Sequence, residues 1–241
     1  MKHAAILLGL LFWSASAQSQ SQSLDYPVGI APDLPYVDVS HGQQQIRVQR
    51  IQDETHVITG SYARTSRHCP PFCINPIQVA PDVKTVGELE LLQFVSRGAG
   101  PEKQLLIDAR TQAWYERGTI PGSIHIPFTA FLESEDTQAF QGLMAQLGVI
   151  PRVAQTSWWS GLLDRLSGLM SRTASANEGR WDFSDAKELM LWCNGPWCDQ
   201  SPRAIRALLD IGYPAEKLYS YRGGMQMWQL FGLTVIIPEN Q

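Results

Sequence analysis

The stretch "LMLWCNGPWCDQSPRAIRALLDIG", residues 189–212, holds a strand, a loop and a helix in succession. The apolar run at 189–192 is typical of a strand buried on both faces. Ser201 is the expected helix N-cap, and Pro202 occupies the first helical position, where its missing N–H costs nothing. Apolar residues then recur at helical spacing until Gly212 stops the helix. The stretch therefore predicts a strand that leads through a loop into a helix N-terminus.

Two cysteines, Cys193 and Cys198, lie in this loop. A helix N-terminus carries roughly half a positive charge and backbone N–H groups without partners, so it favours the thiolate that attacks sulfur. Cys193 is the candidate nucleophile. Cys198 is the candidate resolving cysteine, which would attack a persulfide or mixed disulfide on Cys193. Two plainer interpretations stay open, an inert thiol at the end of the strand for Cys193 and a packing or stapling residue for Cys198.

The loop is also expected to hold an anion by its main-chain N–H groups, without a charged side chain. Gly195 lets the backbone approach closely, and Pro196 stiffens the turn. Trp197 would shield the site or cover a neighbouring segment. The predicted cradle consists of Asn194, Gly195, Pro196, Trp197, Asp199, Gln200 and Ser201.

Strand and helix patterns alternate through residues 85–241, which is typical of a parallel α/β sheet with helices on both faces. Thr85 and Glu88 match a capping box and predict a helix after Thr85. The other elements are predicted from apolar runs and helical spacing: strands at 104–108, 189–192 and 218–221, an alternating strand within 119–127, and helices at 111–118 and about 137–147.

A segment of about 134–185 interrupts this alternation and is interpreted as a helical insertion. Within it, "SWWSGLLDRLSGLMSR" places Trp158, Trp159 and other large apolar residues on one helical face. That face would pack on the parent domain, form a lid over the site, or dock on a membrane or a protein partner.

Residues 1–17 have the three parts of a signal peptide: the basic Lys2, an apolar run, and small residues ending at Ala17. The apolar run is too short for a membrane span of roughly 20 residues. Cleavage near Ala17 would leave a periplasmic or secreted protein with no membrane span. A formal charge of -4 without any basic run excludes a nucleic-acid partner.

Residues 18–84 are predicted to form a flexible Gln/Ser tether and a small β-rich region. The segments 45–51 and 55–62 are the expected arms of a hairpin. In an oxidising compartment disulfides persist, and a Cys69–Cys73 bond is expected if the two prolines between them turn the chain back. Four cysteines allow three pairings. His68, Cys69 and Cys73 are an incomplete zinc ligand set, so no metal is expected.

The main domain resembles a rhodanese domain, the fold of thiosulfate and persulfide sulfurtransferases. The resemblance rests on "LLIDAR" (105–110), "GTIPGSIHIP" (118–127), Cys193 at a strand end, and "YRGGMQMWQLFGLTV" (221–235), in the order of the family. It implies a mostly parallel five-stranded α/β domain and no organic cofactor. One departure is clear: active members usually carry Arg or Lys in the cysteine loop, and this loop is longer and has neither.

Three charged residues are assigned supporting roles. Asp108 would order the loop network, orient a cationic partner, or cap the following turn. Arg110 would face the anion or pair with an acidic residue. Arg203, in the predicted helix, is the nearest arginine in sequence. Arg222 would reach the rim of the site or lie at the surface.

The sequence thus predicts a periplasmic sulfurtransferase in which Cys193 takes sulfane sulfur as a persulfide and passes it to a thiol or to cyanide. The expected small-molecule partner is a sulfur-containing anion or a thiol. A thiol-disulfide redox protein that uses Cys193 and Cys198 is the first alternative. A catalytically inactive rhodanese-like binding module is the second.

Overall fold

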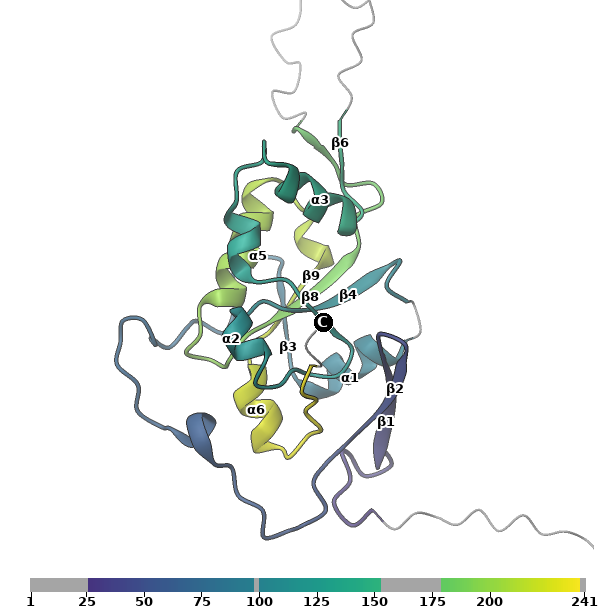
Figure 1. The fold of residues 1–241 in the computed structure, drawn as a ribbon, viewed down its shortest axis with the longest axis vertical. Helices are drawn as coiled ribbons and strands as arrows, with labels where there is room; N and C mark the ends of the chain where they lie inside the picture. The colour runs from purple at the N-terminus through teal and green to yellow at the C-terminus, as the bar shows by residue number, and fades with distance from the viewer. Residues whose placement is uncertain (1–25, 98–99, 153–178, 239–241) are drawn as a thin grey trace, which may run out of the picture.

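A five-stranded parallel sheet forms the centre of the protein (Figure 1). The computed structural model describes residues 26–97, 100–152 and 179–238. In spatial order the strands are β3 (Lys84–Val86), β9 (Leu218–Tyr221), β8 (Glu188–Trp192), β4 (Gln104–Asp108) and β5 (Ser123–His125). Every neighbouring pair is parallel. The predicted α/β fold with a mostly parallel sheet is confirmed, and β8, which leads into the cysteine loop, is the central strand.

Helices cover both faces of the sheet. The helices on one face are α3 (Gln138–Gln146) and α5 (Gln200–Asp210), and those on the other are α1 (Glu88–Ser96) and α6 (Gly224–Leu230). The short α2 (Gln112–Tyr115) connects β4 to β5. A small antiparallel pair, β6 (Ile150–Pro151) and β7 (Trp181–Asp182), lies beyond α3. In the three described ranges, every helix is too short or too polar to cross a bilayer.

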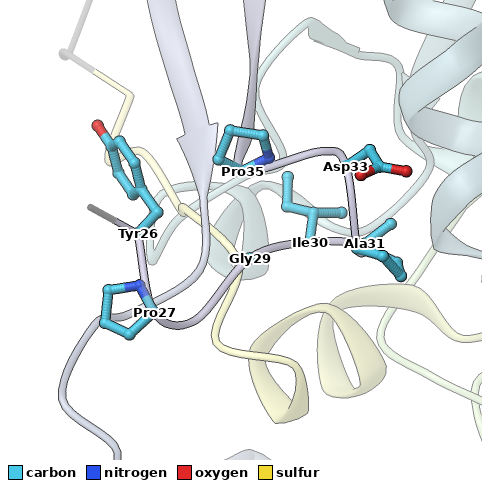
Figure 2. Close-up of a pocket in the computed structure, with 8 residues that line it drawn as sticks. Tyr26, Pro27, Gly29, Ile30, Ala31, Asp33 and Pro35 are labelled. Atoms are coloured by element: carbon cyan, nitrogen blue, oxygen red, sulfur yellow. The ribbon is translucent and has the colours of Figure 1, made fainter. Parts of the chain in front are cut away.

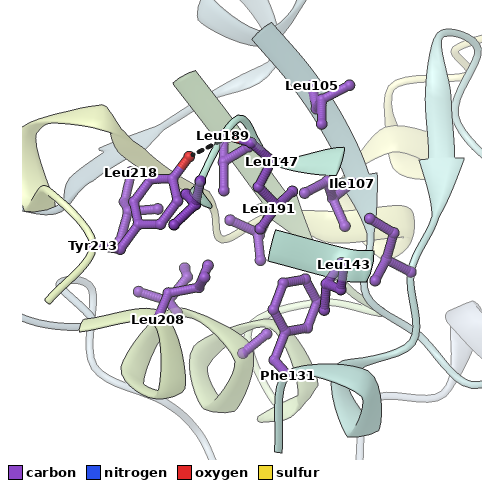
Figure 3. Packing of buried hydrophobic residues seen from close by; sticks show 14 of the residues in the cluster. Leu105, Ile107, Phe131, Leu143, Leu147, Leu189, Leu191, Leu208, Tyr213 and Leu218 are labelled. Atoms are coloured by element: carbon purple, nitrogen blue, oxygen red, sulfur yellow. Dashed lines mark hydrogen bonds between the residues drawn. The ribbon is translucent and has the colours of Figure 1, made fainter. Parts of the chain in front are cut away.

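Side chains of β8 alternate between two apolar cores, as the pleat of a strand requires. Leu189 and Leu191 point to the core under α3 and α5, where Figure 3 shows them among Leu105, Phe131 and Leu208. The helix α3, which lies within the predicted insertion of 134–185, contributes to this core. The Trp158/Trp159 face lies outside the described residues, as does the predicted signal peptide.

The second core includes the N-terminal β region. Met190 and Trp192 of β8 belong to the same apolar cluster as Val39 and Val48, from the two strands of an N-terminal hairpin. Each of these four residues is at most 2% exposed. The N-terminal region therefore packs directly on the sheet face that also carries α1 and α6.

The hairpin differs from the one predicted. Its strands are β1 (Tyr36–His41) and β2 (Gln44–Gln49), joined through Gly42, whose φ of 58° suits a tight turn. The prediction placed the second arm at 55–62, where the structure has only a 3-10 turn, η1 (Gly60–Ala63). The glycine turn before the alternating residues of β2 was the stronger signal and was overlooked.

The predicted capping box at Thr85 is also wrong. Thr85 belongs to strand β3, which pairs with β9, and its hydroxyl donates to the carbonyl of Ile77 at 2.7 Å. Helix α1 begins after Gly87, whose N–H donates to the Glu90 carboxylate at 3.0 Å. A three-residue edge strand carries too little pattern to be recognised, so its residues were assigned to the helix.

Leu191→Ala should destabilise the protein by about 2–5 kcal/mol, because the removed side chain leaves a cavity in a fully buried strand. Urea unfolding followed by circular dichroism measures the change. Leu89→Ala is the matched control: Leu89 is 45% exposed on α1, and its truncation should cost less than about 1 kcal/mol. Equal losses in the two variants would contradict the assignment of the core.

Candidate active site

Cys193 is the first residue after β8, at the carboxyl edge of the sheet. The carbonyls of Cys193 and Asn194 accept bonds from the N–H groups of Met225 and Gln226, both at 3.0 Å. This approach requires Gly224: its φ is 56°, and a Cβ there would lie 2.3 Å from the Cys193 carbonyl oxygen. Both carbonyls thus point to α6, and the backbone N–H groups of Gly195 and Ser201 are donors to the Cys193 sulfur.

The Cys193 sulfur is buried, with 3% of the residue exposed, and several donors face it. The Ser201 hydroxyl lies 3.2 Å from the sulfur. Burial raises the pKa of Cys193, but bonds from Cys198, from the Ser201 hydroxyl and from the backbone N–H groups of Ser201 and Gly195 outweigh it and lower the pKa to about 7. In the thiol form, the sulfur can donate to the Cys198 carbonyl at 3.3 Å.

Ser201 is not the N-cap of α5, as was predicted. Asp199 occupies that position, and its carbonyl accepts the first helical bond, from Arg203 at 2.9 Å. Ser201 lies in the first turn and is 3% exposed, with its hydroxyl turned to Cys193. Pro202 is consequently the third helical residue, which still needs no N–H partner. Because α5 begins earlier than predicted, Ser201 is a donor to the Cys193 sulfur and not the helix cap.

Cys198 is 7% exposed, and neither it nor Cys193 is in a disulfide. Its sulfur lies 3.8 Å from the Asn194 amide nitrogen and 3.6 Å from the Gln200 amide oxygen. Burial and the hydrogen bond and charge of Cys193 raise the pKa of Cys198 well above its ordinary value. Of the two thiols, Cys193 therefore ionises first, and Cys198 is protonated at neutral pH.

Residues 60–79 lie over the loop, and we call them the cover segment; Figure 1 shows this chain in blue between β2 and β3. Asn75 donates twice to the loop, from its N–H to Pro196 O and from its side chain to Cys198 O, both at 2.8 Å. Arg222, which follows strand β9, also holds the segment: its guanidinium donates to Asn75 O at 2.7 Å and to Pro76 O at 3.1 Å.

Between the cover segment and the loop remains a cavity of only about 10 Å³. Both cysteines and Ser201 line it, together with Asn75 and Arg222. A larger surface hollow of about 620 Å³, shown in Figure 2, lies at residues 26–35. None of the predicted site residues lines that hollow, so it is not the candidate site.

Trp197 anchors the disulfide part of the cover segment. Its indole N–H donates to Gln226 at 2.6 Å, the Phe72 ring meets it edge-on at 5.5 Å between centroids, and the Arg67 guanidinium lies 3.8 Å from its ring centre. Cys69 and Cys73, which flank Phe72, are bonded to each other with their Cα atoms 4.7 Å apart. Trp197 thus lies between the loop and the cover segment.

A series of buried, hydrogen-bonded side chains connects strand β4 to the cysteine loop. Tyr62, in η1, donates to the Asn194 amide oxygen at 2.7 Å and accepts from Arg110 at 3.2 Å. Arg110 is 1% exposed and pairs with Asp108 at 2.5 Å. Asp108 also accepts from Thr119 at 2.9 Å. Arg110 therefore forms an ion pair and acts on the loop through Tyr62.

The structure brings some predicted residues together and separates others. Arg203 is exposed on α5, with its guanidinium 4.8 Å from the centre of the Phe128 ring, and does not line the cavity. The sequence does not point to Asn75 or Tyr62, and of the two alternatives for Arg222, the rim and the surface, the structure has the rim. Their bonds join positions more than 120 residues apart, mostly through backbone atoms, and no local sequence pattern reveals such contacts.

Among the described residues, no three His, Cys, Asp or Glu side chains gather as metal ligands. His68, part of the partial set considered from the sequence, has its ring Nδ1 2.7 Å from the Pro70 carbonyl. The polar and thiol side chains that line the cavity are thus two thiols, the hydroxyls of Ser201 and Ser220, one amide and one guanidinium.

Comparison with solved structures finds similar chains at low identity. The human single-domain sulfurtransferase TSTD1 is 18% identical, with 61% of this chain and 96% of that chain covered and a TM-score of 0.35. A thiosulfate sulfurtransferase from Pseudomonas aeruginosa is 15% identical, covering 66% of this chain but 21% of that chain, with a TM-score of 0.36. A protein of Rhodopseudomonas palustris described as a possible tyrosine phosphatase is 18% identical, covering 66% and 88%, with a TM-score of 0.39. No curated protein matches the chain.

The rhodanese-like domain family matches residues 93–230, which is more than half of the chain. The match includes the central strands β4 and β8, the cysteine loop and helices α5 and α6, and it begins after the cover segment. The chain belongs to the rhodanese-like domain family.

Proposed function

We propose that this protein is a sulfurtransferase that carries sulfane sulfur as a persulfide on Cys193 and passes it to a thiol or to cyanide. The observation that carries the proposal is the environment of the Cys193 sulfur, which has a hydroxyl and two backbone N–H groups as donors and a pKa of about 7. About half of the Cys193 side chains are then thiolate at neutral pH, without a cationic residue in the loop.

The reaction begins with attack of the Cys193 thiolate on the outer sulfur of a donor such as thiosulfate. A bond forms between Cys193 Sγ and that sulfur, the S–S bond of the donor breaks, and sulfite leaves with the electron pair. The persulfide is anionic, so the donors at Gly195 and Ser201 suit it as they suit the thiolate. Attack of the acceptor on the outer sulfur then returns Cys193 as a thiolate.

Access to the sulfur requires the cover segment to move. A cavity of about 10 Å³ is at the lower limit for one water molecule and cannot admit thiosulfate. Around Asn75 the segment is held by four hydrogen bonds of Asn75 and Arg222, each of modest net strength. Displacing the segment near Asn75 would expose Cys193 while the sheet and α5 stay in place.

A thiol-disulfide redox protein is the second candidate function. It is favoured by the two free cysteines of one loop, which share hydrogen bonds and have pKa values shifted in opposite directions. Equilibration of the Cys193/Cys198 pair with glutathione buffers would support this function. A Cys193–Cys198 disulfide with a reduction potential below about -300 mV would instead be structural. In a catalytically inactive binding module, Cys193→Ser would leave the biological role intact.

Export to the periplasm, or secretion, is part of the proposal. It is supported by the signal-peptide pattern of residues 1–17 and by the Cys69–Cys73 bond, since disulfides persist in oxidising compartments.

Incubation with thiosulfate should add one sulfur atom to Cys193, detected by mass spectrometry of the intact protein and its peptides. Addition of cyanide should then release thiocyanate. Cys193→Ser should abolish both signals, and the matched variant Cys198→Ser should still take up sulfur. Absence of any adduct on the wild-type protein, under conditions in which Cys193 is free, would reject the sulfurtransferase proposal.

Ser201→Ala should raise the pKa of Cys193, because the thiolate loses its hydroxyl donor. A hydrogen bond to a charged group contributes about 1.5–3 kcal/mol, so alkylation of Cys193 by iodoacetamide at pH 7 should slow about tenfold or more. The rate at high pH should be unchanged, since the thiolate is then fully formed. A matched Ser→Ala change at the exposed Ser184 should leave the pH profile unaltered.

Arg222→Ala should speed the reaction of Cys193 with a bulky thiol reagent severalfold, because the cover segment loses two of its hydrogen bonds. Stopped-flow absorbance with an aromatic disulfide measures the rate. Arg203→Ala removes an arginine that does not line the cavity and should leave the rate unchanged. If both variants react like the wild type, the Arg222 bonds do not limit access.

A further inference from the structure

Four side chains form a continuous hydrogen-bonded chain that ends at the second cysteine. Arg110 donates to the Tyr62 hydroxyl at 3.2 Å, Tyr62 donates to the Asn194 amide oxygen at 2.7 Å, and the Asn194 amide nitrogen lies 3.8 Å from the Cys198 sulfur. Arg110 and Asn194 are at most 2% exposed, and Tyr62 is 9% exposed. The chain is therefore shielded from water along its length.

The charge of Arg110 fixes the direction of every proton in this chain. A guanidinium only donates, so Tyr62 must accept from Arg110 and can use its own proton only toward Asn194. Burial raises the pKa of Tyr62 to about 12, and the hydroxyl keeps that proton at neutral pH. With its oxygen occupied by Tyr62, the Asn194 amide must present its N–H to the Cys198 sulfur.

We propose that Tyr62 is a positioning residue for Cys198: through Asn194 it aims an N–H donor at the Cys198 sulfur and stabilises the thiolate with which Cys198 resolves a persulfide on Cys193. This inference deepens the proposed function and rests on it for the persulfide. Tyr62 precedes the family-matched residues 93–230, so a part of the chain outside the family domain completes the site.

The resolving step uses the two cysteines of the loop, and one external thiol then restores them. The Cys198 thiolate attacks Cys193 Sγ, a Cys193–Cys198 bond forms, and the bond between Cys193 Sγ and the outer sulfur breaks. The outer sulfur leaves with the electron pair and is protonated to hydrosulfide. Both cysteines are oxidised and the outer sulfur is reduced, so an external thiol reductant must return the pair to its starting state.

Other groups around Cys198 determine how strongly its protonation depends on Tyr62. Burial disfavours ionisation of Cys198, and Cys193 adds to this through a hydrogen bond and through its charge, whereas backbone hydrogen bonds from Asn194 and Gln200 favour the thiolate. The Gln200 amide oxygen, 3.6 Å away, accepts from the thiol and favours the protonated form. The charged side chains nearby are Asp108 and Arg110 behind Tyr62, Arg222 on the cavity wall, Arg67 over Trp197 and the adjacent Asp199.

The test measures Cys198 in a Cys193→Ser background, where only one free thiol remains among the described residues. Alkylation of Cys198 by iodoacetamide is followed across pH with and without Tyr62→Phe. Loss of one neutral hydrogen bond should shift the profile to higher pH and slow alkylation on its rising limb about two- to tenfold. The alkylation rate at the high-pH plateau should stay the same. If Tyr62→Phe only loosened the cover segment, the plateau rate would change and the midpoint of the pH profile would stay in place.

Tyr213→Phe is the matched control. Tyr213 is also buried, and its hydroxyl donates to the Lys187 carbonyl at 2.7 Å, on the other face of the sheet. Its removal should cost similar stability without moving the Cys198 profile. Should Tyr62→Phe fail to fold, Asn194→Leu removes the same donor at similar volume and should give the same shift.

A Tyr62→Phe or Asn194→Leu profile that coincides with the parent would overturn the inference. The result is separate from the proposed function, because alkylation needs no sulfur donor. In the protein with both cysteines, Tyr62→Phe should release hydrosulfide more slowly once Cys193 carries the sulfur. Loading that fails already in the wild type would reject the sulfurtransferase and leave the alkylation result standing.

Discussion

The contact between Gly224 and the Cys193 carbonyl is the constraint on which the site depends. Two successive carbonyls of the loop bond to α6, and this is sterically possible only because residue 224 has no Cβ. With these two carbonyls turned to α6, the loop presents the N–H groups of Gly195 and Ser201 to the sulfur. The negative charge of a thiolate or a persulfide is thus balanced by main-chain dipoles and one hydroxyl, in a loop without a cationic side chain.

The part of the protein outside the family domain is as much a part of the site as the loop. Asn75 bonds to two loop carbonyls, Tyr62 sets the Asn194 amide, and Phe72 packs on Trp197. The same N-terminal region contributes Val39 and Val48 to the core behind β8. The N-terminal region therefore packs on one face of the sheet and also covers the cysteine loop. Access to the sulfur is thus coupled to the packing of the domain.

The sequence was sufficient for the elements with strong local signals. The apolar runs of β4, β8 and β9, the helix α3 within about 137–147 and the placement of Cys193 at a strand end all follow from patterns within a few residues. Elements with weak local signals were predicted wrongly. Strand β3 has only three residues, and its Thr85 matches the pattern of a helix cap. Ser201 also matches a helix cap, but α5 begins at Gln200 with Asp199 as its N-cap, so Ser201 lies in the first turn with its hydroxyl toward Cys193.

The roles of charged residues were the hardest to predict, because they depend on contacts distant in sequence. Arg203 is near the cysteines along the chain but does not line the cavity, whereas Arg222 and Arg110 reach the site region through folding. An arginine that binds backbone carbonyls, as Arg222 does, leaves no acidic partner in the sequence to suggest its role.

Three of the four bonds by which Asn75 and Arg222 hold the cover segment involve its main-chain atoms, at Asn75 N, Asn75 O and Pro76 O. A bond to the main chain is indifferent to the side chain that the residue carries. Relatives of this protein could therefore diverge widely in the exposed residues Ile74 and Ile77 while keeping the same closed arrangement. The chemistry of the outward surface over the cysteines is thus independent of the hydrogen bonds that close the segment beneath it.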